Sequence, residues 1–337
     1  MLQGKDFLKI KDFTQDELTY LIDLALHLKG LKAAGIPHKY MEGQNICLLF
    51  EKTSTRTRAA FTVAGADLGA SVEFLGAQDI QLGKKESVAD TGQVLGRIFD
   101  GIEYRGYSQE VVESLAAASP APVWNGLSDV SHPTQMIADF MTIKEVFGQL
   151  DGIKLVYCGD GANNMANSLL MAGAILGVDV TVAAPAGYQP DPSILAEVKD
   201  RAQASGAQIE VTADIKQAVQ GAKVIYTDVW ISMGDEAEAD QRLADLQGYQ
   251  VTQDLMDQAD PSCIFLHCLP AFHDGETSFA QERGLGELEV TDEVFKSQAA
   301  YQFQQAENRM HSIKAIMAAT NGHLFVPQLK KGGTDHD

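Results

Sequence analysis

Hydroxyl and cationic side chains are concentrated at residues 50–61, FEKTSTRTRAAF, directly after the apolar run ICLLF. Four hydroxyl residues lie close together there: Thr53, Ser54, Thr55 and Thr57. Arg56 adds a planar guanidinium suited to phosphate, and a helix starting here would add free N–H groups and a positive dipole end. The same segment also suits a capped helix start with solvated Arg56 and Arg58. Anion binding and simple capping both remain open from this segment alone.

Polar side chains also follow other apolar runs. They are Arg105 after GIEY, His132 and Gln135 in SHPTQ, and HCLP at 267–270 after CIFL. Pro133 suits a first helical turn, so His132 can also be interpreted as a residue of the helix start. Arg309, in ENRMHSIK, would as a lone residue be interpreted as a surface cation. Ligands of parallel α/β folds bind where strands end, so these segments predict a shared polar pocket.

The elements that must position these residues alternate between strand and helix patterns. In the first half we predict helices at 14–31, 55–68, 86–99, 109–117 and about 132–147, and strands at 44–50, 71–75, 101–104 and 122–124. The helix predictions rest on apolar residues three or four apart, as at Phe61, Ala64 and Leu68. GQLDG, at 148–152, breaks the pattern and indicates a domain boundary.

The second half begins with a strand–helix–strand unit: the strand KLVYCGD, a helix at 165–176 and the strand DVTVAAP. Further strands are predicted at 208–211, 223–227 and 263–267. Such units form parallel sheets. We therefore predict an α/β fold of two doubly wound parallel-sheet domains, 1–148 and 149–305, with the active site in the cleft between them. A last helix, about 306–320, has no strand after it and is expected to pack back onto the first domain.

Composition narrows the range of partners. The 337 residues are 45% hydrophobic and 21% charged, which is typical of a globular protein long enough for two cores. The 46 acidic and 26 basic residues give a formal net charge of −20. This excess argues against a nucleic-acid binder and against an anionic membrane surface as partner. A bound anion must therefore meet a local basic pocket.

Four cysteines, Cys47, Cys158, Cys263 and Cys268, occur without a CxxC pair. Three of them lie within apolar runs, so we interpret them as buried reduced thiols and not as disulfides. The first residues carry charges every few positions and form no apolar core of a secretory signal. No run approaches the ~18 apolar residues that span a bilayer. We expect a cytoplasmic protein.

Rival motifs fail in detail. GDGANN offers Gly159 and Gly161, but Asn164 stands where a dinucleotide fingerprint has its third glycine. Gly83 and Lys84 are followed by Lys85, where a Walker A loop has serine or threonine, so this segment is not a Walker A loop. His267, Cys268 and His273 match no standard zinc spacing, and there is no GxSxG elbow. We predict neither a metal nor a cofactor.

STRTR, HPTQ, DVWISMG, FLHCLP and ENRMHSIKA occur in the order seen in ornithine carbamoyltransferases. The sequence resembles that family over nearly its whole length, from FLKIKDFT to the final helix. STRT and HPTQ-like segments are shared with aspartate carbamoyltransferases, so they indicate only carbamoyl phosphate. SMG and HCLP point to ornithine as the second substrate.

The resemblance implies two sets of binding residues. For carbamoyl phosphate they are Ser54, Thr55, Arg56, Thr57, Gln81, Arg105, His132, Pro133, Thr134, Gln135, Cys268, Leu269 and Arg309. Catalytic roles are implied for Arg56, Arg105, His132 and Cys268. For ornithine they are Asn164, with adjacent Asn163 as alternative, Asp228, Ser232 and Met233. In the family the Gln81 loop reaches a neighbouring subunit's site, which implies a homotrimer or an assembly of trimers.

The implied reaction suits these residue types. An amine attacks the carbamoyl carbon, charge builds on the carbonyl oxygen and phosphate leaves. Thr57, Arg105 and His132 are suitable donors for that oxyanion, as Arg56 is for the phosphate. Positioning can supply much of the acceleration without a covalent nucleophile. Asp228, at the end of KVIYTD, can hold an α-ammonium, or it can be a helix or turn cap.

The resemblance thus implies transfer to the δ-amine of L-ornithine, giving L-citrulline and phosphate. The reaction would serve arginine biosynthesis or, in reverse, arginine deiminase-type catabolism. An acceptor such as putrescine is the alternative, although it lacks the amino-acid head that DVWISMG would bind. A non-catalytic amino-acid or anion-binding protein is disfavoured, because oxyanion donors would then have no role.

Overall fold

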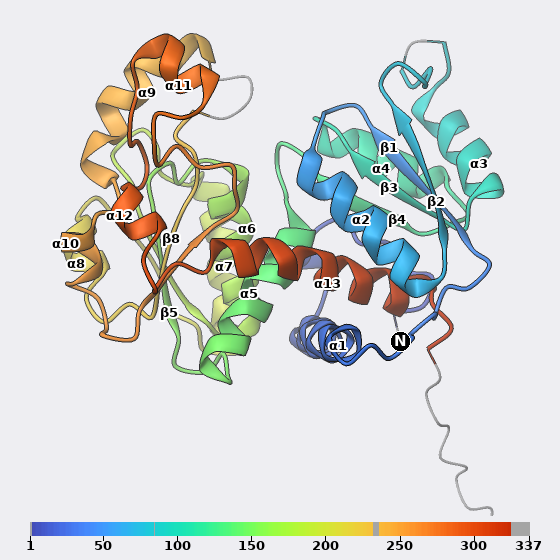
Figure 1. The fold of residues 1–337 in the computed structure, drawn as a ribbon, viewed down its shortest axis with the longest axis horizontal. Coiled ribbons are helices and arrows are strands. Elements are labelled where there is room, and N and C mark those ends of the chain that lie inside the picture. The colour runs from blue at the N-terminus through green and yellow to red at the C-terminus, as the bar shows by residue number, and fades with distance from the viewer. Residues whose placement is uncertain (1, 84, 232–235, 325–337) are drawn as a thin grey trace, which may run out of the picture.

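The chain forms two α/β halves, each built on its own parallel sheet (Figure 1). The computed structural model describes residues 2–83, 85–231 and 236–324. The strand order is β2-β1-β3-β4 in the first sheet and β7-β6-β5-β8-β9 in the second, with every pair parallel. In each sheet the chain first adds strands on one side of its starting strand and then on the other. The predicted doubly wound α/β architecture is therefore confirmed.

The strands are short and mostly buried, as expected for parallel sheets covered on both faces. Those of the first sheet are β1 (Asn45–Phe50), β2 (Ser71–Gly76), β3 (Gly101–Arg105) and β4 (Val123–Leu127). Those of the second are β5 (Lys154–Cys158), β6 (Asp179–Ala183), β7 (Ile209–Thr212), β8 (Val224–Thr227) and β9 (Ile264–His267). β4 runs three residues beyond its predicted end, because a bulge between its pairings with Tyr104 and Arg105 lets the strand continue through Gly126.

The helices connect and cover these strands. They are α1 (Gln15–Ala33), α2 (Thr55–Leu68), α3 (Val88–Ile98), α4 (Gln109–Ala118), α5 (Pro133–Phe147), α6 (Asn164–Leu176), α7 (Pro192–Ser205), α8 (Ile215–Ala218), α9 (Ala239–Leu246), α10 (Gln253–Met256), α11 (Ser278–Arg283), α12 (Asp292–Phe295) and α13 (Gln302–Asn321). Gly69 and Gly148 end α2 and α5 in the left-handed conformation, as their positions after apolar patterns suggested.

The sequence pattern predicted none of the helices α7 to α12, and it placed the start of the last helix too late. The pattern gave no helix at α7, because within that helix only Val198 and Ala202 are buried and the apolar stripe is weak. The last helix begins at Gln302, four residues before its predicted start. Its first turn contains two buried glutamines, Gln302 and Gln305, and the Gln302 side chain donates to the carbonyl of Phe295 at 2.7 Å. Because these glutamines interrupt the apolar pattern, the sequence did not predict this first turn, which tertiary contacts stabilise.

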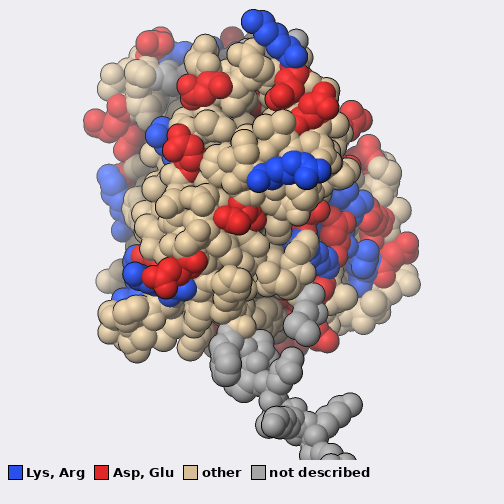
Figure 2. Space-filling model, turned by 90° about the vertical axis from the view of Figure 1, so that its right-hand side faces the viewer, with Lys and Arg blue, Asp and Glu red and all other residues tan. Residues whose placement is uncertain are grey.

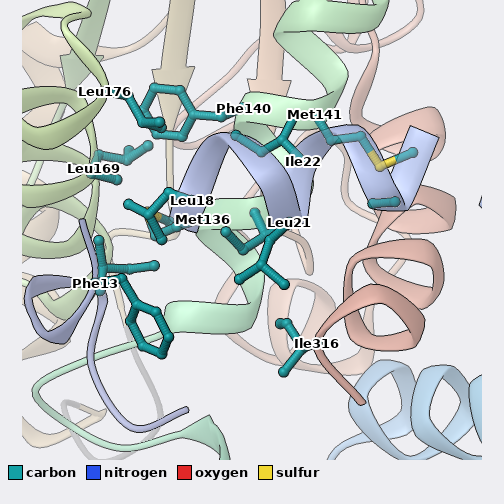
Figure 3. Packing of buried hydrophobic residues seen from close by; sticks show 14 of the residues in the cluster. Phe13, Leu18, Leu21, Ile22, Met136, Phe140, Met141, Leu169, Leu176 and Ile316 are labelled. Carbon is teal, nitrogen blue, oxygen red and sulfur yellow. The ribbon is translucent and has the colours of Figure 1, made fainter. Parts of the chain in front are cut away.

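Helix α13 links the two halves. It starts beside β9 of the second sheet and crosses to the first half, where it packs against α1, α2 and α5 (Figure 1). One apolar cluster fills the space around it. In Figure 3, Leu18 of α1 lies between Leu169 of α6 and Met136 of α5, and Phe140 of α5 lies beside Leu176 of α6. The cluster extends to strands of both sheets, so the two sets of strand ends are fixed relative to one another.

The four cysteines are free thiols, as predicted. Cys47, Cys158 and Cys263 are buried, and Cys268 is partly exposed. Across the described ranges, no helix is both long enough and apolar enough to cross a membrane.

Candidate active site

A cavity of about 570 Å³ lies where strands of both sheets end. Its walls come from the loops after β1, β3, β4, β8 and β9 and from the starts of α2 and α6. The lining residues are Lys52, Thr53, Ser54, Thr55, Arg56, Arg105, Leu127, His132, Asn164, Met165, Asp228, Val229, Ile231, Cys268, Leu269, Pro270, Phe272 and Arg309. The cavity therefore occupies the switch-point position that the topology predicts for ligands.

Most predicted site residues line this cavity, but some do not. Those that lie outside its lining are Thr57, Gln81, Pro133, Thr134 and Gln135. Of these, Gln81 is exposed on the loop after β2, and the other four are buried. Ser232 and Met233 fall outside the described residues. Sequence reasoning missed Lys52 and Phe272, although Lys52 directly precedes the hydroxyl-rich segment and Phe272 closely follows HCLP.

The start of α2 forms one wall of the cavity. Ser54 caps the helix, its Oγ accepting the Thr57 N–H at 3.2 Å. The buried Thr57 Oγ1 accepts from Arg105 Nη1 at 3.4 Å and from Arg309 Nη2 at 3.1 Å. Thr57 therefore orients two guanidinium groups that come from β3 and α13. Capping and anion binding, which the sequence left as alternatives, are compatible here because the cap leaves Arg56 in the cavity lining.

Three arginines give the cavity its positive charge. Burial lowers the pKa of Arg56 and of Arg105. Burial and the guanidiniums of Arg105 and Arg56 together lower the pKa of Arg309 to about 10. A pKa of about 10 keeps Arg309 cationic at neutral pH. Nε of Arg105 and Nε of Arg309 are buried without a hydrogen-bond partner among the described side chains. The cluster is the local basic pocket that an anion requires in so acidic a chain.

His132 lies against this cluster as a neutral imidazole. Burial and the positive charges of Arg309, Arg105 and Arg56 hold its pKa well below the usual value. Its backbone N–H donates to Ser168 Oγ at 3.1 Å, which fixes the residue at the start of α5. A neutral imidazole can donate a hydrogen bond to a developing oxyanion without adding a cation to an already crowded site.

The opposite wall carries a carboxylate and a thiol. Asp228 Oδ1 accepts from Cys268 Sγ at 3.0 Å and from the Val229 N–H at 2.8 Å. Burial and the adjacent Asp228 raise the pKa of Cys268 well above its usual value, so the sulfur stays protonated. Because the thiolate is the nucleophilic form, this arrangement favours a hydrogen-bonding role for Cys268 over covalent catalysis.

The two adjacent asparagines occupy different positions. Asn163 caps α6, accepting the Ala166 N–H at 2.8 Å and donating to Tyr157 Oη at 2.8 Å. Asn164 lines the cavity, and its amide donates to the carbonyl of Ser128 at 3.0 Å. The geometry therefore favours Asn164 over Asn163 as a ligand residue.

Outside the cavity lining, hydrogen bonds of His267 fix the HCLP segment, residues 267–270. The Leu269 N–H donates to His267 Nδ1 at 2.9 Å, which places the imidazole proton on Nε2, 3.2 Å from Glu289 Oε1. Metal-ligand atoms of Asp228, His267 and Cys268 lie within 4.8 Å of one another, whereas His273 belongs to a separate group. The trio His267, Cys268 and His273 weighed in the sequence is therefore not one cluster within the described ranges. Both nitrogens of His267 already have protein partners.

Two models of one protein family match the chain. The model for the aspartate/ornithine carbamoyltransferase carbamoyl-P binding domain matches residues 5–145, and the model for the Asp/Orn binding domain matches residues 151–320. An ornithine carbamoyltransferase of Streptococcus pyogenes serotype M5 (strain Manfredo) is 59% identical over 334 residues, which are 98% of this chain and 99% of the relative. A relative from serotype M1, with the same identity and coverage, is named as catabolic.

Solved structures agree with the sequence matches. The ornithine carbamoyltransferase from Pyrococcus furiosus superposes with a TM-score of 0.88 at 45% sequence identity. The superposition covers 95% of this chain and 98% of that one.

Proposed function

Because this chain belongs to the aspartate/ornithine carbamoyltransferase family, we propose that its cavity holds carbamoyl phosphate and ornithine side by side. The protein is a transferase that moves the carbamoyl group of carbamoyl phosphate to the δ-amine of L-ornithine, giving L-citrulline and phosphate. The observation that carries the proposed arrangement is one cavity with three arginines on one wall and the Asp228–Cys268 pair on the other.

The arginine wall is the carbamoyl phosphate site. Its ligands are Ser54, Thr55, Arg56, Thr57, Arg105, His132, Pro133, Thr134, Gln135, Cys268, Leu269 and Arg309. Arg56 and the N–H groups at the start of α2 bind the phosphate, which leaves as an anion. Arg105 and neutral His132 donate to the carbonyl oxygen, on which charge develops during attack. Thr57 acts through the two arginines, because its hydroxyl holds the guanidinium groups of Arg105 and Arg309 in place.

The reaction is an addition to the carbamoyl carbon followed by elimination of phosphate, which re-forms the carbonyl group. The neutral δ-amine attacks the carbon, the C–N bond forms, and the negative charge moves to the carbonyl oxygen facing Arg105 and His132. The C–O bond to phosphate then breaks, and the electron pair leaves with the phosphate opposite Arg56. The amine proton is lost to a base of the medium or to the departing phosphate. No cofactor is required, since positioning and oxyanion stabilisation lower the barrier.

The second wall binds ornithine. Asp228 accepts the α-ammonium, with Asn164, Ser232 and Met233 contacting the amino-acid head, and Cys268 lies near the δ-amine. Ornithine should exceed putrescine in kcat/KM, because putrescine lacks the amino-acid head and leaves buried polar groups unpaired. Such a mismatch lowers kcat/KM for the mismatched acceptor by up to ~10⁴-fold. Lysine keeps that head, but its chain is one methylene longer, so its amine is misplaced relative to the carbamoyl carbon and its kcat/KM should also be lower. The test is ureido-product formation from carbamoyl phosphate with a panel of amines, and equal turnover of putrescine and ornithine would contradict the proposal.

Assembly into a homotrimer, or into a larger assembly of trimers, completes the site in this proposal. Gln81 is exposed and lies outside the lining of its own chain's cavity, so a neighbouring site is available to it. The α3 side of the molecule, at the right of Figure 1, shows wide uncharged stretches between separate charged groups (Figure 2). Val94 and Ile98 of α3 are 46% and 64% exposed. Three chains of 36.4 kDa give about 109 kDa for a closed ring.

We further propose that residues 1–148, together with α13, bind carbamoyl phosphate, and that residues 149–305 bind ornithine. The four free cysteines suit a reducing compartment, which supports a cytoplasmic enzyme. The acidic composition supports small-molecule substrates over nucleic acid as partners. The direction of flux, toward or away from citrulline, is set by reactant concentrations, because an enzyme leaves the equilibrium unchanged.

A further inference from the structure

Asp139 lies at the centre of a buried hydrogen-bond network between the two halves. It is on α5 and is fully buried. Its Oδ1 accepts from Gln135 Nε2 at 2.7 Å and from Gln305 Nε2 at 2.6 Å, and its Oδ2 accepts from Tyr226 Oη at 3.2 Å. The three donors come from α5, α13 and β8. A buried carboxylate with three donors is a rigid junction, because losing any one leaves a polar group unpaired.

The network reaches both substrate walls. Gln305 Nε2 also donates to Tyr226 Oη at 2.9 Å, and Gln305 Oε1 accepts the His267 N–H at 2.9 Å. Tyr226 lies two residues before Asp228 on the same segment. His267 directly precedes Cys268. Asp139 is thereby connected through a short bonded path to the ends of β8 and β9, which carry the proposed ornithine wall.

The same carboxylate sets the orientation of Gln135. A carboxylate only accepts, so the amide NH₂ of Gln135 must face Asp139 and its oxygen must face away. Gln135 Oε1 is buried and has no hydrogen-bond partner among the described residues. Within the proposed function, this free acceptor is the group available to the carbamoyl NH₂ of the substrate.

We propose that Asp139 is a positioning residue that couples the two substrate walls, through Gln135 on one side and through Tyr226 and Gln305 on the other. The inference rests on the proposed function, because it assigns carbamoyl phosphate to the Gln135 side and ornithine to the Asp228 side. A ligand that fixes Gln135 fixes Asp139, and through it the ends of β8 and β9. Each substrate then raises the affinity for the other, and thermodynamic linkage requires the two effects to be equal.

Tyr226→Phe is the informative variant, because it removes one hydroxyl and keeps the ring that stacks on Tyr157. Asp139→Asn would place the asparagine NH₂ against one of the groups that donate to Asp139, and this variant can fail to fold. Tyr249→Phe is the matched control: its hydroxyl donates to the carbonyl of Ala213 at 2.8 Å in the second half, outside the network.

The measurement is the dissociation constant of L-norvaline, which has ornithine's head without the reacting δ-amine, with and without saturating carbamoyl phosphate. Calorimetry at about pH 8 keeps Asp139 ionised, because burial raises its pKa to about 7. The ratio of the two constants reports the coupling, which typically amounts to 5–150-fold, or about 1–3 kcal/mol. The reverse titration, of carbamoyl phosphate with and without norvaline, must give the same ratio.

We expect Tyr226→Phe to reduce the ratio at least about fivefold, while the affinity for carbamoyl phosphate alone changes less than about twofold. Tyr249→Phe should keep the ratio of the unmodified protein. A ratio of one in the unmodified protein, or an unchanged ratio in Tyr226→Phe, would overturn the coupling. Citrulline formation from ornithine distinguishes the two failures, since it persists when only the coupling is wrong and is absent when the proposed function is wrong.

Discussion

Replacing Arg56 with alanine should lower kcat by roughly 10²-fold, whereas replacing Arg58 should change it little. The two arginines lie two residues apart in α2, so they point to different sides of the helix. Arg56 lines the cavity and interacts electrostatically with Asp228 across it. Arg58 stacks over the Phe74 ring, 3.7 Å from its centroid, on another face.

The magnitude follows from what each side chain contacts. A donor aimed at charge that develops in the transition state contributes about 2.7–4 kcal/mol, or 10²–10³ in kcat. Arg105 and Arg309 remain in the Arg56→Ala variant, so the loss should be at the lower end of that range. Arg58→Ala removes an exposed cation–π contact worth about 0.5–1 kcal/mol, which affects stability and not the barrier.

The assay is the initial rate of citrulline formation at saturating ornithine over a range of carbamoyl phosphate concentrations. Urea unfolding of both variants separates lost activity from lost folding. Arg56→Lys serves as a further variant, because an ammonium keeps the charge but cannot make the bidentate contact. Equal loss of kcat in Arg56→Ala and Arg58→Ala would refute the assignment of Arg56 to the departing phosphate.

Three further outcomes are expected. Gln81→Ala chains and Arg56→Ala chains, each impaired alone, should gain activity when they are mixed and exchange subunits, because some sites then combine an intact arginine wall with an intact donated loop. No gain from verified mixed trimers, or an active monomer by sedimentation, counts against the shared site. Burial and nearby lysines lower the pKa of His311 to about 3. The unfolded chain, with its histidine pKa near ~6.5, therefore binds more protons between these values, and stability falls as the pH is lowered. The urea-unfolding free energy of His311→Gln should decline less than that of the unmodified protein from pH 6.5 to pH 4, and identical slopes would exclude this role. Because Asp228 and burial keep the Cys268 thiol protonated, iodoacetamide at pH 7.5 should modify it more slowly than a free cysteine, and faster modification would show the thiolate to be accessible.

The sequence predicted the layout of the sheets because each strand is a local apolar run followed by a helical pattern. It also placed Ser54, Thr55, Arg56, Arg105, His132 and the HCLP segment in one pocket, since parallel topology brings strand ends to one edge. Arg309 illustrates the limit: by spacing it resembles a surface cation, yet α13 carries it to the Thr57 hydroxyl, 252 residues away in sequence. Only the family resemblance placed it in the site.

The buried network around Asp139 could not be predicted from local sequence patterns either, because most of its members are far apart in the sequence. Asp139 and Gln305 are separated by 166 residues, and each alone is an ordinary polar residue on a helix. Glu103 is a similar case, since it interrupts the apolar pattern of β3 and is fully buried beside Arg105 and Arg309. Burial raises its pKa well above the usual value, and neither carboxyl oxygen has a hydrogen-bond partner among the described residues.

The apolar cluster around α1, α5, α6 and α13 has a consequence for how the protein loses its structure. Multidomain chains commonly unfold in separate steps, each domain melting with its own core. Here Leu48 of the first sheet and Tyr226 of the second belong to one cluster, so unfolding either half exposes apolar surface of the other. The halves should melt in a single cooperative transition. A substrate bound to either wall would then protect the whole chain from unfolding, by about 2.7 kcal/mol at a hundred times its dissociation constant.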